Sequence, residues 1–321
     1  MGTRSFLARQ GHDCAYSPPM RALFSALAIA SVIAGCAHVP AQPEPSFVQG
    51  QLLTADLQPV SDAELLVLAR QARYLLVGEQ HDDRCDHRVQ AEVVRLLGGA
   101  GLWAVGLEMV DVDRVGVLEQ FSAGELPLTS LDWALDWKVN WGIDFADYEP
   151  IFVAAEQTGT PVVPLNLPPK VTRALTDGDP DPVPEELRAL VVPEAEVIAA
   201  PEEQIDYLRS AYEGHGRSRI SDEGWRRFIY VQSLWDSQMA WRAVQIHREL
   251  DRQVIVLAGA GHVWNGWGIA RRLRAYDREA RILSLVAWRG DGPPDPALSD
   301  LFFYCPEAAG PEAARDEASS R

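Results

Sequence analysis

YLLVGEQH (74–81) and VIVLAGAGH (254–262) are the two stretches from which the architecture of this chain can be predicted. Each starts with a short apolar run, which is typical of a strand buried on both faces, and continues through glycine to a histidine. Three other runs have a similar apolar character: WAVGL (103–107), PVVPL (161–165) and RILSLVAW (281–288). The second of these three is the weakest strand candidate, because proline cannot donate a hydrogen bond to a neighbouring strand.

Segments with helical periodicity alternate with these apolar runs. They cover residues 61–72, 84–98, 111–122, 129–137, 221–249 and 263–274, and the first of them opens with a capping box of Ser61 and Glu64. Strands that alternate with helices predict an α/β fold with a mainly parallel sheet flanked by helices. The long segment at about 170–249 is predicted to form a helical cap inserted before the last core strands, although surface decoration would give the same pattern.

The composition limits the classes of function. The 321 residues carry 29 Lys and Arg against 46 Asp and Glu, a formal net charge of −17, which argues against nucleic acid as a partner. The hydrophobic content of 47% supports a folded core, and four cysteines are too few for a disulfide-dense scaffold. Cys85 and Cys305 are either paired with each other or separate buried thiols. The main α/β domain is expected at 48–305, and the charged segment 306–321 is predicted to be a disordered tail.

The first residues have the pattern of an export signal. The apolar run ALFSALAIASVIAG (22–35) follows Arg21 and ends at Cys36. A basic residue before an apolar run that ends in small residues is typical of a secretory signal peptide, which we predict at residues 1–35. Met20 is the natural start for this signal, since the residues before it contain two prolines and few apolar side chains.

Residues Ile33–Cys36 resemble a bacterial lipobox, in which the cysteine thiol is acylated before cleavage. The alternative is a plain signal peptide with an incidental cysteine. Acyl chains at Cys36 would hold the protein in a membrane, with the Pro-rich segment 36–47 as a lipidated tether. Because Ala37 rather than Asp follows the cysteine, we expect a location in the cell envelope, on the outer membrane and facing the periplasm.

The buried strand candidates end in polar residues that are capable of chemistry. In open parallel α/β sheets, ligands bind in the crevice beyond the carboxyl ends of the strands, so we expect these residues to meet there. They are Glu79 and His81 after the first run, Glu108 after the second, Asn166 after the third and His262 after the fourth. The spacing G-x-x-H occurs twice, from Gly78 and from Gly259. The simpler interpretation of each is that glycine ends a strand and histidine caps the next helix.

The residue types in this set are compatible with more than one chemistry. One carboxylate could act as a general base on water while a histidine or a metal stabilises the developing charge. His81, Glu108 and His262 could also supply mixed nitrogen and oxygen ligands to a divalent metal, although no H-E-x-x-H motif specifies zinc. The structural alternatives are that Glu108 is buried against an arginine and that Glu79 is an acid at a helix terminus.

Two further stretches contain candidate ligands. In HDDRCDHR (81–88) we interpret the aspartates as residues of a helix start, where the helix dipole favours them, and His87 as a surface residue. Between 133 and 152 aromatic residues recur every three or four positions, which predicts one helical face with core packing as the default role. The alternative is a flat wall for a planar ligand such as a porphyrin, with Tyr148 or a histidine as axial ligand. The aromatic residues are Trp133, Trp137, Trp141, Phe145, Tyr148 and Phe152.

Together these motifs resemble the ChaN-like haem-binding lipoproteins of the Tiki/TraB/erythromycin-esterase superfamily. The similar pieces span most of residues 70–275 and follow the order of the family. They are YLLVGEQHDDRCDHRVQ (74–90), GLEMV (106–110), the W-x₃-W-x₃-W stretch into DFADYEPIF (133–152), PVVPLNLP (161–168), YVQSLWDSQMA (230–240) and VIVLAGAGHVWNGWGIARRL (254–273).

The resemblance implies a haem-binding bacterial lipoprotein that serves iron or haem acquisition, with haem or another planar small molecule as its ligand. It also implies a homodimer as a candidate assembly. As axial haem ligand, Tyr148 is the first candidate and His215 the second. Asn166 and Asp236 match the motifs of the family and are expected to face the crevice.

The superfamily also contains hydrolases, and this leaves a second hypothesis. Glu79, His81, Glu108 and His262 match the positions of the reaction centre in those enzymes. They would activate water for attack on an ester, amide or similar bond, with or without a divalent metal. A third alternative is a family member that has lost its activity and serves only as a scaffold.

Overall fold

The computed structural model describes residues 47–179, 181–214, 221–290 and 292–306. The predicted signal peptide with Met20, the lipidation site Cys36 and all of the tether before Phe47 lie outside the described residues. The axial ligand candidate His215 and all of the predicted tail after Pro306 also lie outside them. Among the helices of the described residues, none has the length and apolar character needed to cross a membrane.

A single sheet of seven strands forms the centre of the described residues, in the order β1-β7-β6-β2-β5-β3-β4. The strands are β1 (Leu52–Leu53), β2 (Tyr74–Glu79), β3 (Trp103–Asp111), β4 (Val162–Asn166), β5 (Gln253–Gly259), β6 (Ile282–Trp288) and β7 (Leu301–Tyr304). Neighbouring strands are parallel except β1 and β7, which pair antiparallel. The prediction of an α/β fold with a mainly parallel sheet is therefore confirmed.

Helices connect the strands and cover both faces of the sheet. The α-helices are α1 (Asp62–Gln71), α2 (Arg84–Ala100), α3 (Val115–Ser122), α4 (Leu131–Leu135), α5 (Trp137–Asn140), α6 (Phe145–Thr158), α7 (Pro169–Asp177), α8 (Glu202–Gly214), α9 (Asp222–Leu250) and α10 (Ile269–Tyr276). Short 3₁₀ turns lie at Val112–Arg114, Leu128–Ser130, Glu185–Leu187, Glu194–Glu196, Ala260–His262 and Trp264–Gly266. The predicted capping box is present, since Ser61 and Glu64 each bond the other's backbone amide.

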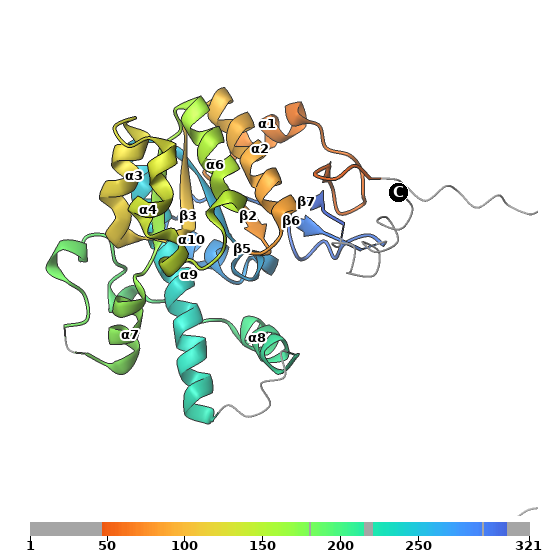
Figure 1. Ribbon diagram of the computed structural model, residues 1–321. Coiled ribbons are helices and arrows are strands. Elements are labelled where there is room, and N and C mark those ends of the chain that lie inside the picture. Colours follow the sequence, from red (N-terminus) through yellow and green to blue (C-terminus); the bar gives the residue numbers. More distant parts are fainter. Residues whose placement is uncertain (1–46, 180, 215–220, 291, 307–321) are drawn as a thin grey trace, which may run out of the picture. The chain divides into compact units, whose positions relative to one another are not determined.

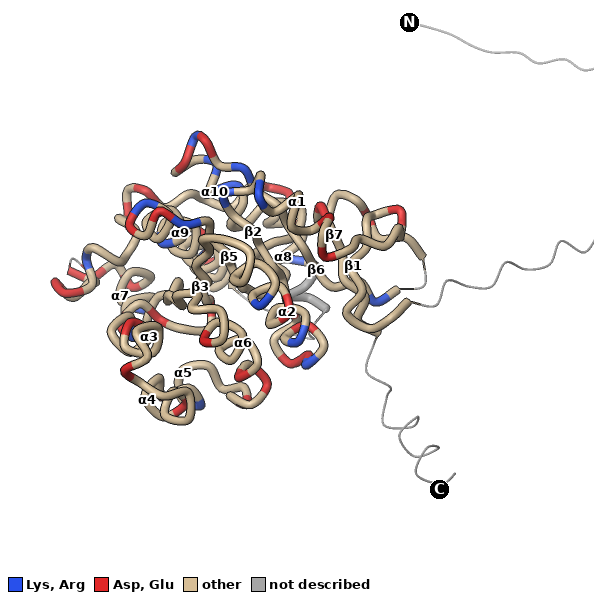
Figure 2. Tube along the Cα trace, turned by 90° about the horizontal axis from the view of Figure 1, so that it is seen from above, with Lys and Arg blue, Asp and Glu red and all other residues tan. Residues whose placement is uncertain are grey.

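Alternate residues of each central strand point into two separate hydrophobic clusters. Leu75 and Val77 pack with side chains of α1, α2, α3 and α6, whereas Leu76 and Val256 pack with side chains of α9 and α10. Figure 1 shows α2 and α6 over one face of the sheet, and the view from above shows the strands between these helices and the helices α9 and α10 (Figure 2). Burial on both faces explains why the strands appear in the sequence as continuous apolar runs rather than as alternating ones.

The strands at the edges of the sheet are those for which prediction from the sequence was weakest. Pro164 is tolerated in β4 because β4 is an edge strand that pairs only with β3. The short strands β1 and β7 at the opposite edge were not predicted. Two residues of β1 and four of β7 give too little pattern for a strand to be recognised from sequence.

The prediction of one continuous helical face across residues 133–152 is wrong. Asp136, in the left-handed region with a φ of 53°, ends α4 and begins α5, and Gly142, with a φ of 88°, lies before α6. Trp133 is 73% exposed, while Trp137 and Phe152 are buried in the core. The regular spacing of aromatics therefore runs across three short helices that present different faces.

The insertion between β4 and β5 contains the helices α7, α8 and α9, and part of it packs into the core. Met239, Ala243 and Ile246 in the second half of α9 are fully buried against the sheet. The first half of α9 projects beyond the sheet layers (Figure 1). Seen from above, the acidic and basic residues of the described segments are spread along the helices and loops (Figure 2).

Candidate functional site

The carboxyl ends of β2, β3 and β5 lie next to one another, because these three strands are neighbours in the sheet. Glu79 at the end of β2 lies opposite Gly259 at the end of β5. A crevice of about 550 Å³ lies beyond these ends. Its polar lining includes His81, Glu108, Asp111 and Asn166, and its apolar lining includes Met109, Trp141, Ile143, Leu167, Val231 and Trp235.

Glu79 and His81 form the first histidine–carboxylate pair. The Glu79 side chain has no exposed surface, and its Oε1 accepts hydrogen bonds from His81 Nδ1 at 2.8 Å and from the Tyr148 hydroxyl at 2.6 Å. Because a carboxylate only accepts, the proton lies on Nδ1 of His81. Among the described residues Nε2 of His81 has no hydrogen-bond partner, and the side chain is 41% exposed in the crevice.

Glu79 and His81 each favour the charged form of the other. Burial lowers the pKa of His81, but the hydrogen bond to Glu79 and the negative charge of Glu108 outweigh burial, so the pKa is raised above its ordinary value. For Glu79 burial acts to raise the pKa, and the hydrogen bond from His81 together with the nearby imidazole of His87 outweighs it, so the pKa is lowered.

Asp236 and His262 form the second pair, directly behind the crevice. His262 Nδ1 lies 2.7 Å from Asp236 Oδ1, and His262 Nε2 lies 3.5 Å from Glu108 Oε1. Asp236 Oδ2 accepts from Gln204 Nε2 at 2.8 Å and lies 3.3 Å from Arg272 Nη1. Burial lowers the pKa of His262, but the charges of Glu108 and Asp236 raise it to about 9, so this ring is an imidazolium at neutral pH.

Gly259 joins the two pairs. Its backbone N–H donates to Glu108 Oε2 at 2.6 Å, and a side chain built on it would place Cβ 2.8 Å from Cε1 of His81. Residues Glu79, His81, Glu108 and His262, expected to meet at one edge of the sheet, are therefore brought together around this glycine. Any larger residue at position 259 would displace the His81 ring, which explains the glycine in the G-x-x-H motif of β5.

The predicted set of metal ligands does not form in this structure. Within the described residues, the one group of three ligand atoms that lie within 4.8 Å of one another is Cys85, Asp86 and Cys305, not His81, Glu108 and His262. Both ring nitrogens of His262 already face carboxylates. Cys85 and Cys305 are joined in a disulfide, so their thiolates are not free for a metal.

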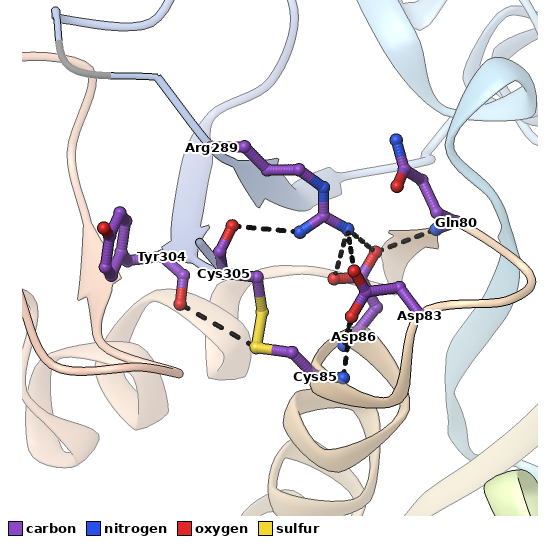
Figure 3. Close-up of a disulfide and its surroundings, with 7 residues drawn as sticks. All are labelled: Gln80, Asp83, Cys85, Asp86, Arg289, Tyr304 and Cys305. Atoms are coloured by element: carbon purple, nitrogen blue, oxygen red, sulfur yellow. Dashed lines mark hydrogen bonds and ion pairs between the residues drawn. A yellow bond between two sulfur atoms is a disulfide. The ribbon is translucent and has the colours of Figure 1, made fainter. Parts of the chain in front are cut away.

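The disulfide between Cys85 and Cys305 lies beside a cluster of polar side chains that includes Asp86 and Arg289 (Figure 3). It settles the alternative left open by the sequence, since the Cα atoms of Cys85 and Cys305 are 5.9 Å apart and the sulfurs are bonded. Next to it, buried Asp86 accepts the backbone N–H of Gln80 at 2.8 Å and binds Arg289 through both oxygens at 2.7 Å. Burial raises the pKa of Asp86 to about 6 in spite of Arg289.

Several predicted roles change with these positions. His87, predicted on the surface, is completely buried on the inner side of α2, because its side chain packs against Tyr148 beneath Glu79. Tyr148 itself is 1% exposed, does not line the crevice and donates to Glu79. Burial and the charge of Glu79 raise its pKa, so a phenolate at this position is disfavoured, and the structure does not present Tyr148 as an axial ligand.

Asn166 and Asp236 were both expected to face the crevice, but only Asn166 lines it. Asn166 lines the crevice, and its Oδ1 accepts the backbone N–H of Leu167, which leaves its amide group as a donor. Asp236, expected to face the crevice, is instead fully buried behind His262, because its two oxygens are used by His262, Gln204 and Arg272.

Sequence reasoning missed Asp111, Gln204 and Arg272. Asp111 lies at the end of β3 in the crevice, where burial and the charge of Asp113 raise its pKa to about 7. Its signal was present, because it is the first acidic residue after the apolar stretch that follows Glu108, but it was assigned to a helix start. Gln204 and Arg272 gave no signal, since only the fold brings them to Asp236.

Comparisons with known proteins show the family and agree with the fold. The family model described as haem-binding uptake, Tiki superfamily, ChaN matches residues 65–273. A solved structure described as cofacial heme binding to ChaN of Campylobacter jejuni is 17% identical, with a TM-score of 0.62 over 79% of this chain and 95% of that chain. At this identity the likeness shows a shared fold.

Two further solved structures are less similar. The type III effector HopBA1 is 14% identical, with a TM-score of 0.46 over 77% of this chain and 94% of that chain. A mutant of the erythromycin esterase EreC is 14% identical, with a TM-score of 0.43 over 74% of this chain and 76% of that chain. No curated protein matches the chain.

The position of Gly259 gives a direct test of the site geometry. Gly259→Ala is expected to lower the free energy of unfolding by about 1–3 kcal/mol, because the new methyl group displaces His81 and breaks its charged hydrogen bond to Glu79. Urea denaturation measures the change. Gly261→Ala is the matched control, since a Cβ there meets no atom within 4 Å, and it should change the free energy by less than about 0.5 kcal/mol. Equal stability of the two variants would show that the His81 ring is not held against Gly259.

Proposed function

The chain belongs to the ChaN family of haem-binding uptake proteins in the Tiki superfamily, and from this premise we propose that it binds haem in the crevice beyond β2, β3 and β5. The residues of the crevice fit such a ligand. Its apolar walls, which include Trp141, Ile143 and Leu167, suit the flat hydrophobic faces of a porphyrin. Arg173 lines the same crevice and has no ion-pair partner among the described residues, so it is available to a carboxylate of the ligand.

The observation that carries the proposal is the state of His81. Its Nδ1 is fixed on the Glu79 carboxylate, while Nε2 is unpartnered within the described residues and belongs to a ring that lines the crevice. Histidines that bind metals have this arrangement, in which an acceptor on one nitrogen fixes the tautomer and orientation of the other. Haem iron accepts a histidine nitrogen as an axial ligand. We therefore place His81, rather than Tyr148, as the candidate axial ligand.

The other residues that line the crevice would position the ligand and keep water away from it. The Trp141 ring meets the His81 ring edge to face at 4.9 Å and restricts its rotation. The side chains of Met109, Val231 and Trp235 are also part of the apolar lining of the crevice. Haem, when bound, supplies an iron that accepts this nitrogen.

A lipid-anchored role in iron or haem acquisition at the outer membrane, facing the periplasm, is part of the same proposal. It is supported by the lipobox-like residues Ile33–Cys36 and by the Pro-rich segment that follows them. The expected mature protein begins at an acylated Cys36, which mass spectrometry of protein extracted from membranes would detect. An unmodified cysteine, or a mature chain that begins elsewhere, contradicts the anchor.

Haemin titration tests the binding proposal. The purified protein should produce a Soret band with haemin, and His81→Ala should weaken binding about tenfold or more, because the iron loses its nitrogen ligand. His247→Ala is the control, since His247 lies on α9 and bonds the Arg252 carbonyl outside the crevice. Wild-type protein without a Soret band would refute haem binding. If His81→Ala binds haemin with unchanged affinity, a residue other than His81 is the axial ligand of the iron.

A second candidate function is hydrolysis, and one observation favours it. Two histidines, each with Nδ1 on a carboxylate, lie on either side of Gly259, and only His81 has a nitrogen free to take a proton from water. His262, held as an imidazolium, would stabilise negative charge that develops beside Glu108.

Hydrolysis predicts turnover of p-nitrophenyl esters that rises with pH, because His81 acts as a base only when it is neutral. Since its pKa is raised above the ordinary 6.5, the half-maximal rate should lie above pH 6.5. Glu79→Gln should lower the rate about 100-fold. Glu92→Gln is the control, because Glu92 is an exposed residue of α2 that pairs with Arg95. A flat pH profile, or equal rates in both variants, rules this candidate out.

A further inference from the structure

His87 is a buried histidine that neither function has used. It lies on α2 with no exposed surface, and its ring packs on Tyr148 with the ring centres 4.0 Å apart. Among the described residues neither of its nitrogens has a hydrogen-bond partner of good geometry. Its Nε2 nevertheless lies 3.4 Å from Glu79 Oε2, an oxygen that is also without a partner. Two unpartnered polar atoms therefore face each other in the interior.

The chemistry of the two groups determines which tautomer His87 adopts. A carboxylate oxygen can only accept, so a proton on Nε2 of His87 makes the contact attractive, while a lone pair there would make it repulsive. A shift of a few tenths of an ångström closes 3.4 Å to an ordinary N–H···O distance. With this donor, Glu79 receives three: His81 and Tyr148 on Oε1 and His87 on Oε2.

Glu79 depends on these donors because it has no stronger partner. Its side chain is fully buried, and within the described residues no lysine or arginine forms an ion pair with it. A buried carboxylate without donors is strongly disfavoured, and one with donors on a single oxygen is free to turn about its last bond. A donor on Oε2 removes that freedom and keeps Oε1 directed at His81 Nδ1.

We propose that His87 is a positioning residue, which donates to Oε2 of Glu79 and thereby holds His81 with Nδ1 protonated and Nε2 directed into the crevice. The ligand that uses Nε2 rests on the proposed function, whereas the positioning itself does not. His87 does not line the crevice, and its two contacts on the way to His81 are Glu79 Oε2 and the ring of Tyr148. The variants must therefore separate the donor to Glu79 from the ring packing on Tyr148.

Substitutions that differ only in the place of a donor test this role. His87→Gln brings an amide nitrogen to the position of Nε2 and should preserve the arrangement. His87→Asn carries the same amide but is too short to reach Oε2, and His87→Phe keeps the ring stacked on Tyr148 without any donor. Long-range ¹H–¹⁵N correlation spectra of the protein without haem report the tautomer of His81 at a pH where it is neutral.

We expect the wild type and His87→Gln to show His81 protonated on Nδ1, and His87→Asn and His87→Phe to show a mixture of tautomers. Haemin should bind about tenfold more weakly to the Asn and Phe variants than to the Gln variant. In a Glu79→Gln background the substitution His87→Phe should have no additional effect on the His81 signals, because the contact that it removes is already changed.

The outcomes separate this inference from the haem proposal. If His87→Asn and His87→Phe retain the wild-type signals of His81, or if His87→Gln loses them as the others do, His87 only fills space and the inference is wrong. If His87→Phe does not fold, the comparison of Gln with Asn decides between the same two results. If the wild type binds no haemin, the proposed function fails, and the spectra of the haem-free protein still decide the role of His87.

Discussion

The burial of the Glu79 carboxylate is the constraint on which the rest of the site depends. A negative charge at the end of a central strand, with no lysine or arginine beside it among the described residues, is stable only where donors converge on it. The donors are His81 in the turn after β2, Tyr148 on α6 and His87 on α2. The Glu79 side chain therefore links three separate segments of the chain. His81 is presented to the crevice as a consequence of this arrangement, because its other nitrogen is committed to Glu79.

The same solution occurs at Asp236, on the opposite side of Gly259. There the donors are His262, Gln204 and Arg272, and Arg272 also bonds the Ile198 carbonyl in the insertion. The carboxylate therefore ties the insertion to the end of β5. This link agrees with the burial of the second half of α9 against the sheet. The two carboxylates differ in one respect: His81 has a free nitrogen and His262 has none within the described residues.

The sequence predicted those features whose cause is local or periodic. The central strands were recognised because both faces are buried, and the polar residues at their ends were expected to meet because parallel strands end at one edge. The inward position of His87 could have been recognised too, since it is in helical phase with the buried Ala91 and Val94. The pairing of Cys85 with Cys305 could not, because it requires the unpredicted strand β7 to end beside α2. The aromatic spacing led to a wrong prediction because the regular intervals between aromatic residues give no sign of the left-handed backbone at Asp136, which ends one helix and begins the next.

Haem binding and hydrolysis draw on one feature of this site, the lone pair on Nε2 of His81. An iron takes that lone pair permanently, whereas a water proton takes it only during a reaction, so the two uses exclude each other at any moment. The raised pKa of His81 affects the two uses in opposite directions: it makes the imidazole a stronger base, but it also makes the proton a stronger competitor for an iron. The apolar part of the crevice lining favours the binding use, because it suits a porphyrin face. Trp141 beside the ring and the apolar wall beyond it therefore weigh toward a site that holds a planar ligand.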